Sequence, residues 1–137
     1  MAIESVFSSF GVSVSGLTAQ RRKLDAVASN IANAYTTRTP EGGPYRRKDV
    51  SFEEQTFDDY LYRGVNAVDS VEDNADAVKV FDPSHPDADK DGYVAYPNVR
   101  VVDEMVSMVA SSRAYEANVQ VFQASKAMIT KSFDLLV

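Results

Sequence analysis

The sequence predicts a mainly α fold in which long N- and C-terminal helices form an antiparallel, coiled-coil-like pair, joined by a small β-rich middle domain. Both ends of the 137-residue chain repeat apolar residues at alternating spacings of three and four, the period of a helix face. After Pro97 the chain contains neither glycine nor proline, whereas residues 35–97 contain all 5 prolines. These observations predict three domains, which are residues 1–34, 35–97 and 98–137.

The N-terminal segment carries a heptad pattern that predicts an apolar seam along one helix face. The predicted seam consists of Ile3, Phe7, Phe10, Val14, Leu17, Leu24 and Ile31, with Arg21 and Ala28 in the remaining positions. Helix propensity is weaker in the first half, because Gly11 and Gly16 each cost about 1 kcal/mol relative to alanine. We therefore expect this first half to be only marginally helical without a partner.

The C-terminal segment carries the same pattern through five heptads. Its predicted seam consists of Val101, Met105, Met108, Tyr115, Val119, Phe122, Ile129, Phe133 and Leu136, with Ser112 and Lys126 as polar members. Asn98 is the predicted N-cap, since its side chain can accept a hydrogen bond from the first turn. At about 1.5 Å per residue this helix would be roughly 58 Å long.

The helix length decides between a compact globule and an extended hairpin. A compact chain of this size has a radius of gyration of about 14 Å and a diameter near 37 Å, which is shorter than the helix. The two helices are therefore expected to lie side by side. The seam between two helices cannot also bury five further apolar residues of the C-terminal helix, which are Val102, Val106, Val109, Val121 and Leu135. An exposed apolar surface of that length predicts that the chain assembles side by side with partner chains.

The middle domain is predicted to contain short strands. Residues 64–72 and 77–82 are expected to be two strands joined by a turn at 73–74, and residues 93–96 a third. A short helix is expected to include Phe52, Phe57, Tyr60 and Leu61.

Charge and composition exclude several classes of function. The net charge is −6, and residues 35–97 carry 7 basic and 14 acidic groups, which argues against nucleic acid as a partner. The absence of cysteine excludes disulfides and thiolate metal sites. No apolar stretch is long enough for a membrane span, and no signal peptide is visible at the N-terminus.

The chain shows no catalytic set, so we expect no enzyme activity and no cofactor. His85 is the only histidine, and it lies between prolines in a rigid turn, where an imidazole is a poor general base. The Gly42-Gly43 segment lacks the lysine and the following helix of a phosphate-binding loop.

One acidic segment resembles the opening of a calcium loop. Asp87, Asp89 and Asp91 precede Gly92 at the spacing of such loops. However, the twelfth position is Asn98, which cannot supply the bidentate carboxylate, and prolines replace the entering helix. An acidic turn before a strand explains the same residues, so no metal ligand is predicted. A calcium-binding interaction module centred on residues 87–91 is the alternative function.

Two stretches resemble the signatures of flagellar rod and hook proteins. Residues 27–34, Val-Ala-Ser-Asn-Ile-Ala-Asn-Ala, are similar to the N-terminal signature, and residues 113–118, Arg-Ala-Tyr-Glu-Ala-Asn, to the C-terminal one. Residues 37–50 and 82–99 resemble the proximal-rod members in particular. The signature residues are Asn30, Asn33, Tyr115 and Asn118. The chain departs from the pattern at Tyr35, where the broader family usually has asparagine.

The resemblance implies a structural subunit of the proximal rod of the bacterial flagellar basal body. It implies that the terminal helices polymerise into an inner tube, which serves as drive shaft and export channel wall, and that the middle forms an outer layer. The implied partners are copies of itself, other flagellar rod proteins and the flagellar type III export apparatus. The implied location is the periplasmic rod, reached without a cleaved signal peptide.

Overall fold

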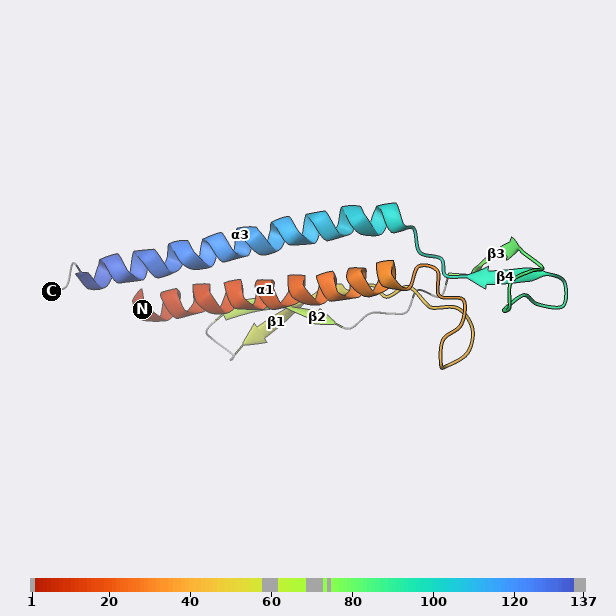
Figure 1. Cartoon of the computed structure of the whole chain (residues 1–137). Helices are drawn as coiled ribbons and strands as arrows, with labels where there is room; N and C mark the ends of the chain where they lie inside the picture. The colour runs from red at the N-terminus through yellow and green to blue at the C-terminus, as the bar shows by residue number, and fades with distance from the viewer. Residues whose placement is uncertain (1, 58–61, 69–72, 74, 135–137) are drawn as a thin grey trace.

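Two long helices and two short β-hairpins make up the chain in the computed structural model, which describes residues 2–57, 62–68, 73 and 75–134. In chain order the elements are α1 (Ala2–Ala32), β1 (Ser51–Phe57), β2 (Tyr62–Val68), β3 (Val78–Phe81), β4 (Tyr93–Tyr96) and α3 (Val101–Asp134) (Figure 1). The helix-rich fold with a β-containing middle is confirmed. No helix among these residues combines the length and the apolar character that crossing a membrane requires.

The two helices lie side by side and run in opposite directions, so the start of α1 and the end of α3 lie at the same end of the molecule (Figure 1). Contacts along the pair fix this arrangement: Phe10 meets Phe122, Gly16 meets Asn118, and Asn30 meets Glu104. With 34 residues, α3 is about 51 Å long at 1.5 Å per residue. The predicted extended hairpin of helices is therefore present.

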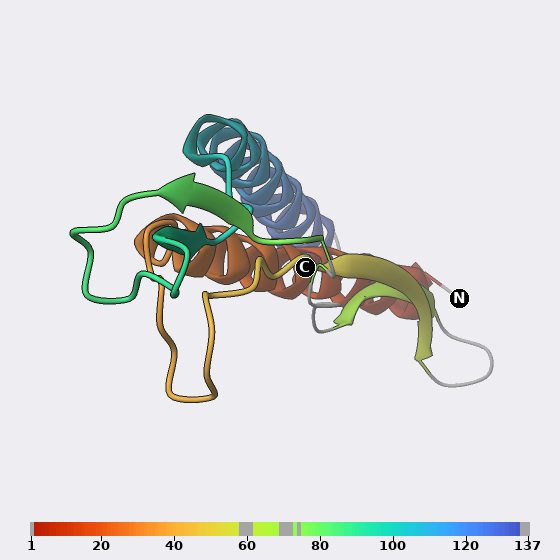
Figure 2. The ribbon, with the colours of Figure 1, turned by 90° about the vertical axis from the view of Figure 1, so that its right-hand side faces the viewer.

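Helix α1 lies between α3 and the β1–β2 hairpin (Figures 1 and 2). Ala19 of α1 packs with Val50 and Ala67, where the small alanine side chains allow the helix and strand backbones to approach closely. Two hydrogen bonds reinforce this contact: the Ser15 hydroxyl accepts from the backbone N–H of Val65, and the Arg22 guanidinium donates to the carbonyl of Ala67. The hairpin is thereby fixed to α1, which a two-stranded sheet needs because it is marginal alone.

The β3–β4 hairpin extends beyond the other end of the helix pair (Figure 1). Its strands are antiparallel, with Val80 opposite Val94 and Phe81 opposite Tyr93. Gly92 precedes β4 with φ of +81°, a conformation that favours glycine, and a Cβ there would lie 2.9 Å from the Phe81 ring. Glycine is thus required at this turn for both backbone and packing reasons.

Several predictions for the middle domain are wrong in detail. Residues 64–72 and 77–82 were expected to be two strands joined by a turn, but β2 pairs with β1 and β3 pairs with β4, in two separate sheets, and residues 69–72 and 74 fall outside the described residues. The expected short helix is wrong at Phe52 and Phe57, which lie in β1, while Tyr60 and Leu61 fall outside the described residues. Phe52 and Phe57 are five residues apart, a spacing that fits neither the period of a helix nor that of a strand. Pairing with β2 therefore decides that this segment is a strand.

The start of α3 also differs from the prediction. The expected N-cap, Asn98, precedes the helix, and the carbonyl of Arg100 accepts the first helical hydrogen bond, from Glu104 N–H at 3.1 Å. Residues 97–100 connect β4 to α3 without regular secondary structure.

Few apolar side chains are buried in the described part of the chain. The fully buried ones are Ala19, Val27, Ala34, Val50, Ala67 and Val94, and three of these are alanines. Eighteen large apolar side chains are exposed there, ten of them on the two helices. A single chain thus leaves most of its large apolar surface unburied.

Candidate functional site

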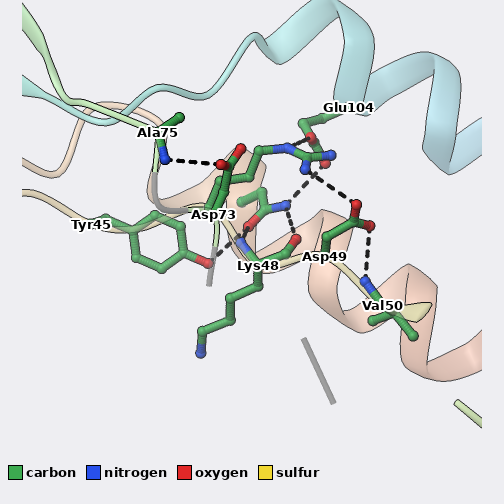
Figure 3. Close-up of polar contacts among 9 residues, drawn as sticks. Tyr45, Lys48, Asp49, Val50, Asp73, Ala75 and Glu104 are labelled. Carbon is green, nitrogen blue, oxygen red and sulfur yellow. Dashed lines mark hydrogen bonds and ion pairs between the residues drawn. The ribbon is translucent and has the colours of Figure 1, made fainter. Parts of the chain in front are cut away.

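A cluster of buried polar side chains joins the C-terminal end of α1, the first turn of α3 and the segment 45–49 that crosses between them (Figure 3). Its centre is Asn30, whose side chain is 0% exposed. The Asn30 Nδ2 group donates to the carbonyl of Lys48 at 2.7 Å, and Oδ1 accepts from the Lys48 N–H at 2.8 Å. The side-chain amide of Asn30 thus forms with the Lys48 backbone the same pair of hydrogen bonds that a residue of an adjacent β-strand would form.

The remaining hydrogen-bonding capacity of Asn30 is also used. Its second Nδ2 proton is donated to Glu104 Oε2 at 3.1 Å, and its Oδ1 accepts a second bond from the Tyr45 hydroxyl at 3.0 Å. An amide has two donor protons and two acceptor lone pairs, so this set of partners is complete. The side-chain amide of Asn30 therefore makes all four of its hydrogen bonds within the chain.

Glu104 is the second centre of the cluster, and only 1% of its surface is exposed. One carboxylate oxygen accepts from Asn30, and the other accepts from Arg47 Nε at 2.7 Å. A carboxylate buried without such partners would be strongly destabilised by the loss of hydration. Within the described residues, every buried side-chain nitrogen and oxygen has a hydrogen-bond partner.

Arg47 closes the cluster on the side of the crossing segment. Burial alone would lower its pKa, but the hydrogen bond and charge of Glu104, together with Asp49 at 3.6 Å, outweigh burial and raise the pKa of Arg47. Its backbone carbonyl also accepts from the N–H of Asp73 at 3.0 Å. Arg47 therefore stays charged and ties the crossing segment to both α3 and the chain beyond β2.

Sequence reasoning identified only part of this cluster. Asn30 was a predicted signature residue, but neither Glu104 nor Arg47 was predicted as a site residue. The available signal was the position of Glu104, which falls on the inner face of α3 at helical spacing from Met108 and Ser111. A charged residue on a buried helix face requires a partner elsewhere in the chain.

The other signature residues lie at two places on the helices. The Asn33 side chain donates to the carbonyl of Ser29 at 2.9 Å and accepts from the Thr36 hydroxyl at 3.2 Å, so it closes the end of α1. Asn118 faces Gly16, where a Cβ would lie 3.0 Å from Asn118 Nδ2. Tyr115 is 37% exposed on α3.

The predicted seam is only partly the buried face of the helix pair. Phe10 and Phe122 meet edge to face at 4.8 Å between ring centroids. The half-buried seam residues are Leu17, Leu24, Ile31, Val101, Met108, Val119 and Ile129, and the exposed ones are Val14, Met105, Tyr115 and Phe133. The side chains of Ile3, Phe7 and Leu136 fall outside the described part of the structure.

The most buried positions of α3 are polar. Glu104, Ser111 and Ser125 face inward, each one residue before the predicted seam positions Met105, Ser112 and Lys126. Small or hydrogen-bonded side chains allow the helices to approach closely at these positions, and Met105, beside Glu104, is exposed. At these three places the most buried residue therefore lies one position before the predicted seam residue.

An apolar stripe runs along the opposite face of α3. We call it the outer stripe; it consists of Val102, Val106, Val109, Val121 and Met128, all exposed. Val102, Val106 and Val109 lie at helical spacing on the side away from Glu104 and Ser111, and Val121 and Met128 continue the stripe on its flank, beyond the exposed Arg113, Glu116 and Gln120. No element of the described chain covers the outer stripe.

The acidic turn at residues 82–92 has a structural explanation. Asp89 Oδ1 accepts from the backbone N–H groups of Asp91 and Tyr93, and Asp87 accepts from the Thr37 hydroxyl and lies 3.9 Å from Arg38. In the described part of the chain no group of three or more His, Cys, Asp or Glu side chains is placed to hold a metal ion. The structure therefore gives no support to a calcium-binding module at this turn.

The family models and the relatives that match this chain are all flagellar rod proteins. Residues 10–38 match the family model described as flagella basal body rod protein, and residues 90–135 match the flagellar basal body rod FlgEFG protein C-terminal model. The chain is 43% identical to the flagellar basal-body rod protein FlgC of Borreliella burgdorferi, with 96% of this chain and 97% of that protein covered. It is 42% identical to the protein of the same name in Bacillus subtilis (96% and 98% covered) and in Escherichia coli O157:H7 (98% of each).

Proposed function

The chain belongs to the FlgC family of flagellar basal-body rod proteins, and we propose that it is a structural subunit of the proximal flagellar rod that polymerises through its two long helices. In this role it forms part of the drive shaft and of the wall of the export channel. Its partners are copies of itself and other rod proteins.

The outer stripe on α3 is the observation that carries this proposal. Soluble monomeric proteins rarely expose this many large apolar side chains along one helix, because each exposed residue forgoes the stabilisation of burial. Exposed apolar residues that recur between Val102 and Met128 of one long helix suit a long, stiff partner such as a helix of a neighbouring subunit. Stiff helices packed laterally in this way can transmit torque without a catalytic step.

The coiled-coil-like seam completes the proposed mode of assembly. Met105, Tyr115 and Phe133 belong to the heptad repeat and are exposed in the single chain. They flank the face that contacts α1, so a neighbouring helix that packs beside the pair would bury them together with part of the outer stripe. Each subunit then contributes one face to its own helix pair and another to the rod.

The rod location implies export, and we propose that the flagellar type III apparatus carries the chain to the periplasm without cleavage of a signal peptide. The two-hairpin middle has no disulfide and a small core, so it can unfold for passage and refold on arrival. Mass spectrometry of the N-terminal peptide from purified basal bodies tests this: a peptide that begins at Met1 or, after removal of the initiator methionine, at Ala2 is expected, and a start about 15–30 residues further along would contradict it.

The test of assembly is the double substitution of Val106 and Val109 by Asp in cells that lack the native chain. Both side chains are exposed, so the subunit itself should remain folded, while two carboxylates in the rod interface would lose their hydration. Electron microscopy of basal bodies should show rings with absent or stunted rods, and cells should not swim.

The matched control is Gln123→Asp, which adds a carboxylate at an exposed polar position of the same helix. It should leave rods and swimming intact. Export is measured in parallel from the amount of chain in the periplasm, which separates failed assembly from failed export. Normal rods in the double variant would reject the outer stripe as an assembly surface.

A further inference from the structure

The apolar residues between α1 and α3 repeat so regularly that they do not define how far one helix is displaced along the other. On α3, Val101, Met108, Tyr115, Phe122 and Ile129 recur every seven residues. On α1, Phe10, Leu17, Leu24 and Ile31 do the same. If α3 moved by one heptad, Phe10 would face Ile129 or Tyr115 in place of Phe122, and a large apolar contact would remain.

The small residues of the interface repeat as well. Gly16 faces Asn118, and the positions one heptad away on α3 are Ser111 and Ser125, both buried and small. A displaced pair would therefore set Gly16 against a serine, which fits as well as asparagine or better. Neither the large nor the small side chains of this interface distinguish the observed register from its two neighbours.

Asn30, Arg47 and Glu104 do distinguish these registers. Glu104 meets Asn30 near the end of α1. A shift of one heptad in one direction would bring Ser111 opposite Asn30 and move Glu104 beyond Ala32, the last residue of α1. The opposite shift would bring Pro97, which precedes α3, opposite Asn30. In both cases Asn30 and Arg47 lose the carboxylate, and a buried charge is left without its partners.

We propose that the Asn30–Arg47–Glu104 cluster fixes the register of the α1–α3 pair, and that the apolar contacts stabilise the pair without selecting it. A buried polar group at a single position is known to specify register in helix pairs, at some cost in stability. Because Arg47 lies on the crossing segment, the same cluster fixes the middle of the chain to that register. The register in turn determines which apolar residues each subunit presents on its outside.

The test uses the absence of cysteine, so that each introduced pair gives a single cross-link. The native register is reported by Gly16→Cys with Asn118→Cys. The displaced registers are reported by Gly16→Cys with Ser111→Cys or with Ser125→Cys. Each pair is oxidised in purified basal bodies and in the purified chain, and gel electrophoresis separates cross-links within one chain from those between chains.

With the cluster intact, only the native pair should form a cross-link within the chain. The cluster is then replaced by apolar side chains of similar size, Glu104→Leu with Arg47→Met, so that no charge is left buried alone. The expected result is a loss of the exclusive native cross-link and the appearance of at least one displaced cross-link. The milder Glu104→Gln, which keeps an acceptor for Asn30, should retain the native cross-link alone.

Two results would overturn the proposal. One is an unchanged native cross-link with no displaced species in the Glu104→Leu, Arg47→Met chain, which would show that other contacts select the register. The other is loss of the helical circular dichroism signal in that chain, which would show that the cluster holds the helices together. Because the cross-links are also measured in the purified chain, the register can be determined even if the variant does not assemble into rods.

Discussion

The carboxylate of Glu104 lies 3.1 Å from the side-chain amide of Asn30, although 74 residues separate them in the chain. Both groups are buried, and each has its other partners in the segment 45–49. This one contact therefore links the N-terminal helix, the C-terminal helix and the middle of the chain.

Asn30→Asp should disrupt this contact. The substitution turns a donor into an acceptor that faces Glu104 Oε2 and the Lys48 carbonyl, so the free energy of unfolding should fall by about 3 kcal/mol or more at neutral pH. The loss should diminish as the pH falls, because protonation of the new carboxyl restores a donor. Chemical denaturation at neutral and mildly acidic pH measures both effects.

Asn33→Asp is the control for this prediction. Asn33 bonds only within the end of α1, where an added acid opposes the helix dipole and should cost less than about 1 kcal/mol. Equal losses in the two variants would contradict the central role of Asn30.

Gly16→Val should separate the helices. A Cβ added at this position would lie 3.0 Å from Asn118 Nδ2, and the two methyl groups of valine would add a further clash of about 1–3 kcal/mol. In an Asn118→Ala background the space opens, so the same substitution should cost clearly less. Thermal unfolding of the four chains gives this coupling, and additive effects would show that the two positions do not meet.

Phe122→Asp should abolish incorporation into rods. The Phe122 ring packs edge to face on Phe10, and a carboxylate there would lose that contact and part of its hydration, at a cost of about 3 kcal/mol. Swimming in soft agar and the rod content of basal bodies are the measurements. The adjacent Gln123→Asp should behave like the native chain, and normal swimming by Phe122→Asp cells would count against the packing.

The carboxyl group of Asp82 should titrate below the usual range of an aspartate. The hydroxyl and the backbone N–H of Ser84 both donate to it, which lowers the pKa of Asp82, and His85 contributes in the same direction. Any stabilisation from this turn is then present above the unfolded-state pKa and lost as the pH falls through the lowered folded-state pKa. The titration is followed by NMR at the carboxyl carbon.

Ser84→Ala should raise the pKa of Asp82 toward its ordinary value, because the hydrogen bond from the Ser84 hydroxyl is the largest cause of the lowered pKa. Ser132→Ala, which removes a hydroxyl on α3 that bonds only to Met128, should leave the titration unchanged. An unshifted pKa in Ser84→Ala would contradict the hydrogen-bond explanation.

The two long helices could be predicted from the sequence because their signal is local and repeated. Apolar residues at three- and four-residue spacing, with no glycine or proline after Pro97, define α3 almost to its ends, and the exposed valines of the outer stripe were expected from the same pattern. The short strands around residues 78–81 and 93–96 were also found, since each is a short run rich in apolar and aromatic side chains between turn residues.

Strand pairing and the polar cluster required the tertiary structure. Residues 51–57 carry too few apolar side chains to distinguish strand from helix, and only the β2 strand opposite them settles the choice. Likewise, nothing near Glu104 in sequence indicates that Asn30 and Arg47 are its partners. The sequence by itself determined the elements whose residues stabilise one another within a few turns. The tertiary structure decided which polar groups are buried together, because a buried charge is tolerated only where distant parts of the chain supply its hydrogen bonds.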